Sequence, residues 1–170
     1  ASALKEVFGN RVLIQRCRAH KLRNVLEKVP ERDRESLKAE IQRAWASDAK
    51  QAKRMLLLTA ANLERRYPAA ASSLREGLAE TLTCNELGLL HDCALTRFLV
   101  TTNPLESLYA RHTNDSRRVC RWRNGDMLLR WTGTSLAMAE ASFTAIEDKA
   151  ALRRLETALN KHFRRLGAAA

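Results

Sequence analysis

The chain has 170 residues, of which 45% are apolar and 29% charged, a composition typical of a folded globular protein and not of a disordered one. Only 5% are aromatic, and the 6 glycines and 3 prolines favour helices with short connections over an all-β sandwich. The 30 lysines and arginines exceed the 19 acids by 11, so polyanions, nucleic acid first, are the predicted partners.

The sequence predicts neither a membrane segment nor a disulfide framework. The longest apolar run, residues 55–61, is too short to span a bilayer, and no signal segment opens the chain. The 4 cysteines lack the regular spacing of a disulfide scaffold, so we expect them to be reduced. The chain opens without Met, inside what reads as the last turns of a helix, and we therefore expect a piece of a longer protein.

The first thirty residues predict a helix end, a short strand and a basic helix. Residues 3–8 are helical, and Gly9 and Asn10 end that helix. Residues 12–14 are apolar on both sides of a pleat, which indicates a strand buried on both faces. Residues 17–29 have helical periodicity. Six lysines or arginines lie within 11–28, opposed only by Glu27, and form either a solvated face or one wall of a phosphate-binding groove.

Residues 31–95 are predicted to be helical almost throughout. Asp48 is a helix cap, Pro68 ends the helix that runs to Tyr67, and residues 83–85 form a turn. Three apolar stripes mark the helices: Leu37, Ile41 and Trp45; Met55, Leu56 and Leu63; Leu74, Leu78 and Leu82. This stretch reads as an all-helical insertion between the strand and the helix that follows residue 103.

The C-terminal part predicts three further helices. Residues 97–100 are either a short strand or an extended lead-in. Residues 114–116 break a helix that begins near Asn103, and Asp126 caps a long helix after a turn at 124–126. The last helix begins near residue 147, and we expect its stripe to pack against the domain and not to form an independent coiled coil. That stripe is Leu152, Leu155, Leu159, Phe163 and Leu166.

The sequence TTNPLES, residues 101–107, has the pattern of a helix start. Asn103 is a good N-cap, Pro104 suits the first helical position, and Glu106 follows at the third. A stripe with helical spacing then predicts one packed face: Leu105, Leu108, Tyr109 and His112. One interpretation of Glu106 is purely structural, with its side chain folded back onto the Asn103 amide in a capping box.

The second interpretation comes from resemblance. TTNPLES, the upstream block QRCRAHKLRN (residues 15–24) and the downstream block 118–131 resemble, in the same order, the Mutator-type family of bacterial insertion-sequence transposases. In that family the glutamate of the TNPxE block is the third carboxylate of an Asp-Asp-Glu metal site. The resemblance therefore implies that Glu106 is a catalytic metal ligand, with Mg²⁺ or Mn²⁺ as cofactor. Carboxylates suit these ions, and a helix N-terminus favours the negative charge.

The resemblance also implies the fold and its limits. We expect a mainly α chain, the C-terminal part of an RNase H-like α/β domain with one or two short strands. Residues 1–30 would end the RNase H-like core, 31–96 would be the helical insertion, and 97–170 would carry the Glu-bearing helix, the Arg/Trp-rich segment and the last helices. Both family aspartates would lie upstream of Ala1, so this chain alone should not catalyse.

Cys17 and His20 have a Cys-x-x-His spacing that suggests zinc, but structural zinc needs four ligands, so we expect none. The family carries the same signature, which implies that this pair packs and hydrogen-bonds beside the site, as we also expect for Asn103. A role of His20 at a phosphate stays open.

An arginine cluster is interleaved with Trp122 and Trp131, against only Asp115 and Asp126. We predict DNA contacts from these arginines and a core position for both tryptophans, with stacking on an unpaired base as the alternative. By resemblance Asp115 interrupts a more evenly basic stretch. The predicted DNA-binding residues are Lys21, Arg23, Arg111, Arg117, Arg118, Arg121, Arg123 and Arg130.

The resulting prediction is a transposase that cuts DNA at element ends and joins them to target DNA. The predicted partners are terminal-repeat and target DNA and further copies of the intact protein, without membrane contact, in the bacterial cytoplasm at the nucleoid. Two rivals are a non-catalytic basic helical module that binds nucleic acid, or a remnant of an element, and a small zinc-stabilised interaction domain.

Overall fold

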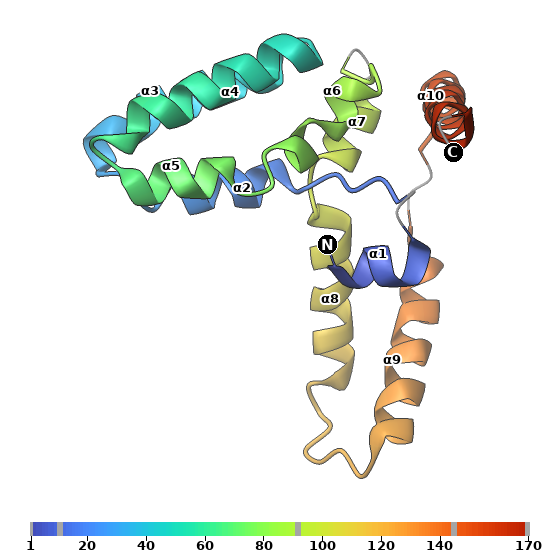
Figure 1. The fold of residues 1–170 in the computed structure, drawn as a ribbon. Helices are drawn as coiled ribbons and strands as arrows, with labels where there is room; N and C mark the ends of the chain where they lie inside the picture. The colour runs from blue at the N-terminus through green and yellow to red at the C-terminus, as the bar shows by residue number, and fades with distance from the viewer. Residues whose placement is uncertain (1, 10–11, 91–92, 144–145, 169–170) are drawn as a thin grey trace. The chain divides into compact units, whose positions relative to one another are not determined.

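The structure is a computed structural model that describes residues 2–9, 12–90, 93–143 and 146–168 (Figure 1). The chain forms two compact units: a large unit of residues Ala1–Thr101 and Asp148–Ala170, and a small unit of residues Thr102–Glu147. The predicted segments 1–30 and 31–96 thus share one unit. Across the described ranges the chain is helical without a strand, so the mainly α prediction is confirmed.

Four helices pack around the main core of the large unit: α2 (Arg18–Leu26), α3 (Glu31–Trp45), α4 (Ala49–Glu64) and α5 (Pro68–Arg75). Asp48 caps α4 as predicted and accepts a hydrogen bond from the Gln51 amide at 3.0 Å. α4 ends at Glu64 and not at Tyr67, because the residue before a proline is driven out of the α region. The predicted stripes supply much of the core: Leu37, Ile41, Trp45, Leu56, Leu74, Leu78 and Leu82.

The strand predicted at 12–14 is absent, and residues 12–17 are instead an extended segment held by helical neighbours. Its partners are the 3₁₀ helix η1 (Ala79–Leu82) and α6 (Thr83–Glu86). The Arg16 amide donates to the Glu80 carbonyl at 2.8 Å, the Thr83 hydroxyl donates to the Ile14 carbonyl at 2.7 Å, and the Gln15 side-chain oxygen accepts from the Cys84 amide at 2.9 Å. We call this junction of residues 14–16 with 80–84 the clasp. Only the first of these bonds joins two backbones, so no strand ladder forms.

Arg16 extends the clasp towards the end of α5. Its guanidinium pairs with the Glu76 carboxylate at 3.0 Å. Gly77 lies beneath that side chain with φ +59°, and a Cβ at this position would collide with the Arg16 guanidinium. The left-handed backbone favours glycine here, and any side chain at this position would also displace the Arg16 guanidinium.

Two further local predictions were wrong in the large unit. Residues 83–85, predicted as a turn, lie in α6, and residues 97–100 are neither strand nor extended, since α7 spans Cys93–Leu99. The Val100 amide still donates to the Thr96 carbonyl at 2.9 Å, which continues the helical bonding. The Val100 carbonyl accepts from the Arg18 amide at 2.8 Å and so ties the end of α7 to the start of α2.

The small unit is a hairpin of α8 (Asn103–Ser116) and α9 (Gly125–Glu140). Asn124, and not Asp126, caps α9, with its side-chain oxygen accepting from the Met127 amide at 2.9 Å. Asp115 joins the two helices by accepting from the buried Ser135 hydroxyl at 2.5 Å. The acid that interrupts the basic stretch therefore has a structural partner.

The remaining helices are α1 (Ser2–Phe8) and α10 (Lys149–Ala168). Gly9 follows α1 with φ +73° and ends it as predicted, whereas Asn10 lies outside the described residues. The α10 stripe is only partly covered: Leu152 is 37% exposed, Phe163 40% and Leu166 38%. The predicted packing of this stripe against the domain is therefore incomplete.

Candidate nucleic-acid interface and the start of α8

Glu106 lies in the exposed first turn of α8, one position later in the helix than predicted. Thr102 is the N-cap residue, and the Glu106 amide donates to its carbonyl at 2.9 Å. The Thr102 hydroxyl donates to Glu106 Oε1 at 2.6 Å. The prediction of a capping box between Asn103 and Glu106 is therefore wrong. Because α8 begins at Asn103, Glu106 lies beyond the N3 position that such a box needs.

The packed face predicted for α8 is also incomplete. Leu105 is 59% exposed and Tyr109 72%, while Leu108 and His112 are half-buried. α8 packs against α9 within the small unit, so its covered side is narrow.

The described residues contain no group of three or more His, Cys, Asp or Glu side chains that could hold a metal ion. The described aspartates outside α9 serve local roles: Asp33 accepts from Tyr67, Asp48 and Asp148 accept from backbone amides, and Asp115 accepts from Ser135. Asp126 lies exposed in the first turn of α9, and Asp92 falls outside the described residues. Glu106 thus offers one carboxylate, whereas Mg²⁺ requires several oxygen ligands.

The upstream block is largely built into the large unit. Arg18 is buried, with its Nε donating to the Thr81 carbonyl at 3.0 Å and its guanidinium 5.4 Å from the ring centroid of Trp45. Asn85 completes the network by donating to the carbonyls of Trp45 at 3.0 Å and Ser47 at 2.8 Å. Burial lowers the pKa of Arg18 from its ordinary value. The sequence contained no periodic signal for this buried polar network.

Lys21, predicted to contact DNA, has a different role in the structure. Its side chain is 1% exposed, and its ammonium donates to the carbonyls of Ser73 and Glu76 at the C-terminal end of α5. Burial, with a smaller effect of Arg16, lowers its pKa to about 8. A group enclosed in this way cannot reach a phosphate. Arg23, on the same helix, is exposed and stays a predicted DNA contact.

Cys17 and His20 lie together at the start of α2, with 3.2 Å between Cys17 Sγ and His20 Nδ1. Cys17 is half-buried and His20 is exposed. The expected hydrogen-bonding role of this pair agrees with the contact.

The structure brings four of the predicted DNA-binding arginines to one groove on the small unit, where α8 ends and α9 begins. None of the four forms an ion pair with a residue that the structure describes. Trp131 also lines the groove, and no acidic side chain does. The lining residues that sequence reasoning missed are Val119, Cys120, Asn124 and Met127; their only signal was a position between the arginines. The four arginines, which we call the arginine groove, are Arg118, Arg121, Arg123 and Arg130.

The other cluster members lie outside this lining. Arg111 donates to the Ser142 hydroxyl and so joins α8 to the end of α9. Arg117 is the exposed C-cap of α8. The prediction that both tryptophans belong to the core was wrong, since Trp122 is 38% exposed and Trp131 42%. The hairpin is too thin to enclose an indole, because Ser135 and Ala139 are its only buried helical residues within the described part.

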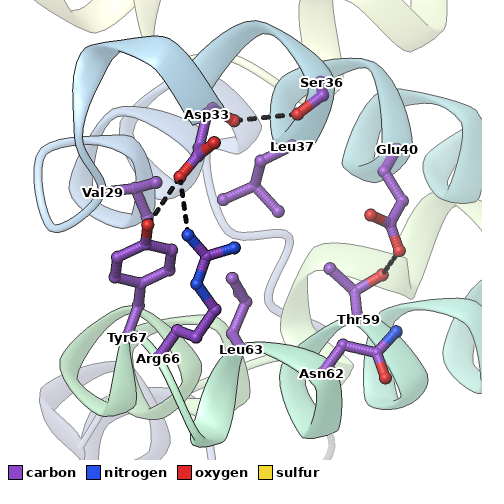
Figure 2. Close-up of a pocket in the computed structure, with 10 residues that line it drawn as sticks. All are labelled: Val29, Asp33, Ser36, Leu37, Glu40, Thr59, Asn62, Leu63, Arg66 and Tyr67. Carbon is purple, nitrogen blue, oxygen red and sulfur yellow. Dashed lines mark hydrogen bonds and ion pairs between the residues drawn. The ribbon is translucent and has the colours of Figure 1, made fainter.

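A second hollow lies in the large unit between α3 and α4, with polar side chains at both ends and Leu37 and Leu63 between them (Figure 2). At one end Asp33 accepts a hydrogen bond from the Tyr67 hydroxyl at 2.6 Å and lies 3.7 Å from the Arg66 guanidinium. At the other end Glu40 accepts from the Thr59 hydroxyl at 2.5 Å. Both acids are thus engaged within the helix pair, and we interpret the hollow as a structural contact between helices.

Replacing Tyr67 with phenylalanine tests that interpretation. The Tyr67 hydrogen bond is the main cause that lowers the pKa of Asp33, with Arg66 and Arg32 adding to it. We expect the variant to be less stable than the wild type near neutral pH, because the hydrogen bond to Asp33 is lost. Because the lowered pKa stabilises the fold only while Asp33 is charged, the difference should shrink as the pH falls below about 4. Urea unfolding at several pH values measures this, and a constant difference would contradict it.

Comparison with known proteins identifies the family of the chain. The profile of the family described as "Transposase, Mutator family" matches residues 1–145, so the chain belongs to the Mutator family of transposases. It is similar to the "Transposase for insertion sequence element IST2" of Acidithiobacillus ferrooxidans, with 31% identity over 109 residues. The match covers 62% of this chain and 36% of that protein, so the chain corresponds to little more than a third of its relative. No solved structure matches the chain.

The family resemblance seen in the sequence is thereby confirmed. In the described residues no helix is long and apolar enough to cross a bilayer.

Proposed function

We propose that the chain is the C-terminal part of the RNase H-like catalytic domain of a transposase. The intact enzyme would cut DNA at the ends of its element and join the 3′-hydroxyls to target DNA. The observation that carries the proposal is the family match over residues 1–145, which includes Glu106 in an exposed first helical turn. The two aspartates of the metal site would come from sequence preceding this chain.

Glu106 would supply one carboxylate ligand to Mg²⁺ or Mn²⁺, the ions that fit its hard oxygen donors. When bound, the metal ions activate the attacking oxygen and stabilise the leaving one. The Thr102 hydroxyl, at 2.6 Å from Glu106 Oε1, would hold the carboxylate in place. Asn103, Cys17 and His20 would support the surroundings of this site.

The arginine groove would hold the DNA backbone, together with the exposed Arg23. Guanidinium groups bind phosphates through two parallel hydrogen bonds, and those of the groove are not neutralised by acids in the described structure. The intact protein would act as a homo-oligomer on terminal-repeat and target DNA, at the nucleoid in the cytoplasm.

The proposal is tested with the full-length protein and a labelled element end. We expect cleavage that is lost on chelation and restored by Mg²⁺ or Mn²⁺. Absence of metal-dependent cleavage, in the presence of DNA binding, would favour the alternative of a non-catalytic nucleic-acid-binding module. The observation that favours this alternative is that Glu106 is a single carboxylate at the start of α8, whereas a Mg²⁺ site needs several oxygen ligands.

The DNA-binding part of the proposal has its own test on the 170-residue chain. Changing Arg130 to Gln removes one phosphate contact of the groove. We therefore expect about tenfold weaker DNA binding at low salt, and a slope of log K against log salt concentration that is smaller in magnitude by about one. The matched control is Arg43→Gln on α3, which should change neither quantity by more than about twofold. Equal effects of the two changes would mean that only net charge matters.

A further inference from the structure

The arginine groove contains an aromatic ring with open space around it. Trp131 lines the groove together with Met127 and Arg130. The same three residues and Thr134 line another hollow of the small unit, next to the groove. Trp131 therefore borders two hollows, and 42% of its surface is exposed to solvent. A flat ligand group can approach the indole without displacing packed side chains.

In the part of the chain that the structure describes, the cations around this ring are not paired with acids, unlike several cations of the large unit. In the large unit Arg16 pairs with Glu76, Arg75 pairs with Glu64, and Asp33 lies between Arg32 and Arg66. The groove arginines have no such partners among the described residues. Of the two acids near them in sequence, Asp115 is engaged by Ser135, and Asp126 does not line the groove. Uncompensated cations around an open indole suit a ligand that is both anionic and aromatic.

We propose that the groove binds unpaired, single-stranded DNA, with a base stacked on Trp131 and neighbouring phosphates on the arginines. This inference rests on the proposed DNA-binding function and narrows its substrate. In the interior of a duplex both faces of each base are covered by its neighbours, so the indole has no face to stack on there. In a single strand each base offers a free face, and stacking on an aromatic side chain adds to the phosphate contacts.

The test compares Trp131→Leu with Trp122→Leu in the 170-residue chain. Trp122 is the matched control, because it belongs to the same unit, is 38% exposed and does not line the groove. Fluorescence anisotropy measures affinity for an oligothymidylate of about 12 nucleotides and for a blunt duplex of similar length. We expect Trp131→Leu to weaken single-strand binding about tenfold and duplex binding less than about twofold. Trp122→Leu should change both by less than about twofold.

Cys120 provides an independent readout, since it is exposed and lines the same groove. Oligothymidylate at saturation should slow alkylation of Cys120 at least about fivefold, and the duplex at equal occupancy should slow it less. The comparison cysteine is Cys84, which is buried and should react slowly in every case. Mass spectrometry after short exposure separates the two sites.

Each outcome is decisive. Two results together would show that the groove is a general phosphate site and that the inference is wrong. Trp131→Leu would change the binding of single strand and of duplex by the same factor, or change neither, and both ligands would protect Cys120 equally. If the wild-type chain binds no DNA at all, the proposed DNA-binding function fails first. Circular dichroism of both variants should match the wild type, since both side chains are exposed.

Discussion

Replacing Glu106 with glutamine in the full-length protein is expected to lower the rate of metal-dependent DNA cleavage by about a thousandfold or more. Glutamine keeps the shape of the side chain and can still accept a hydrogen bond from the Thr102 hydroxyl. It removes the negative charge, and a neutral amide is a much weaker ligand for Mg²⁺ than a carboxylate. DNA affinity should stay within about twofold, because the change leaves the arginine groove intact.

The matched control for this change is Asp126→Asn. Asp126 is also an acid in the first turn of an exposed helix, but the family resemblance gives it no metal role. The control should cleave at a rate within about twofold of the wild type. Cleavage by the Glu106→Gln protein at a comparable rate would show that Glu106 is only part of the helix start.

Replacing Lys21 with methionine is expected to destabilise the large unit by about 2 kcal/mol near neutral pH. The change leaves two carbonyls at the end of α5, those of Ser73 and Glu76, without their donor. Part of the loss is offset, because methionine does not carry the cost of a buried charge. Arg23→Met, on the exposed side of the same helix, should change stability by less than about 0.5 kcal/mol.

The pH dependence of the Lys21 change has a definite sign. The pKa of Lys21 in the folded chain is about 8, below the ordinary value for lysine, so between these values the unfolded chain binds more protons than the folded one. Raising the pH above about 8 therefore stabilises the wild type at this site, and the neutral amine still has two N–H donors for the two carbonyls. The difference between wild type and Lys21→Met should grow from about pH 7 to about pH 9.5.

Urea unfolding followed by tryptophan fluorescence measures both effects. Trp45 is 6% exposed, whereas Trp122 and Trp131 are already open to solvent, so the change of signal reports mainly on the large unit. A Lys21→Met protein as stable as the Arg23→Met protein would mean that the α5 carbonyls find other donors.

The helices were predictable because their signal is local. Apolar spacing located α3, α4 and α10, and the Asp48 cap and the Gly9 stop depend on neighbouring residues alone. Features decided by distant residues were not predictable. The segment 12–14 has the composition of a strand but meets η1 and α6, and so it forms a clasp and no ladder.

The same distinction separates the site residues. The positions of Glu106 and the arginines follow from the resemblance and the chemistry of their side chains. Whether a cation reaches solvent depends on the tertiary fold: Lys21 and Arg23 differ by two positions, and one is enclosed while the other is exposed. Trp131 looks like a core residue in the sequence and is exposed because the hairpin offers it no interior.

The clasp has a consequence for how this part of the protein changes over evolution. Because residues 14–16 are bonded to residues 80–84, the chain leaves the clasp and returns to it at the same place. The segment that contains helices α2 to α5 therefore starts and ends at the clasp, and its two ends keep a fixed separation. Changes of length in this segment are expected away from the α3–α4 junction, because Asn85 holds the carbonyls of Trp45 and Ser47 there. Relatives in which this segment differs in length are expected to keep the clasp.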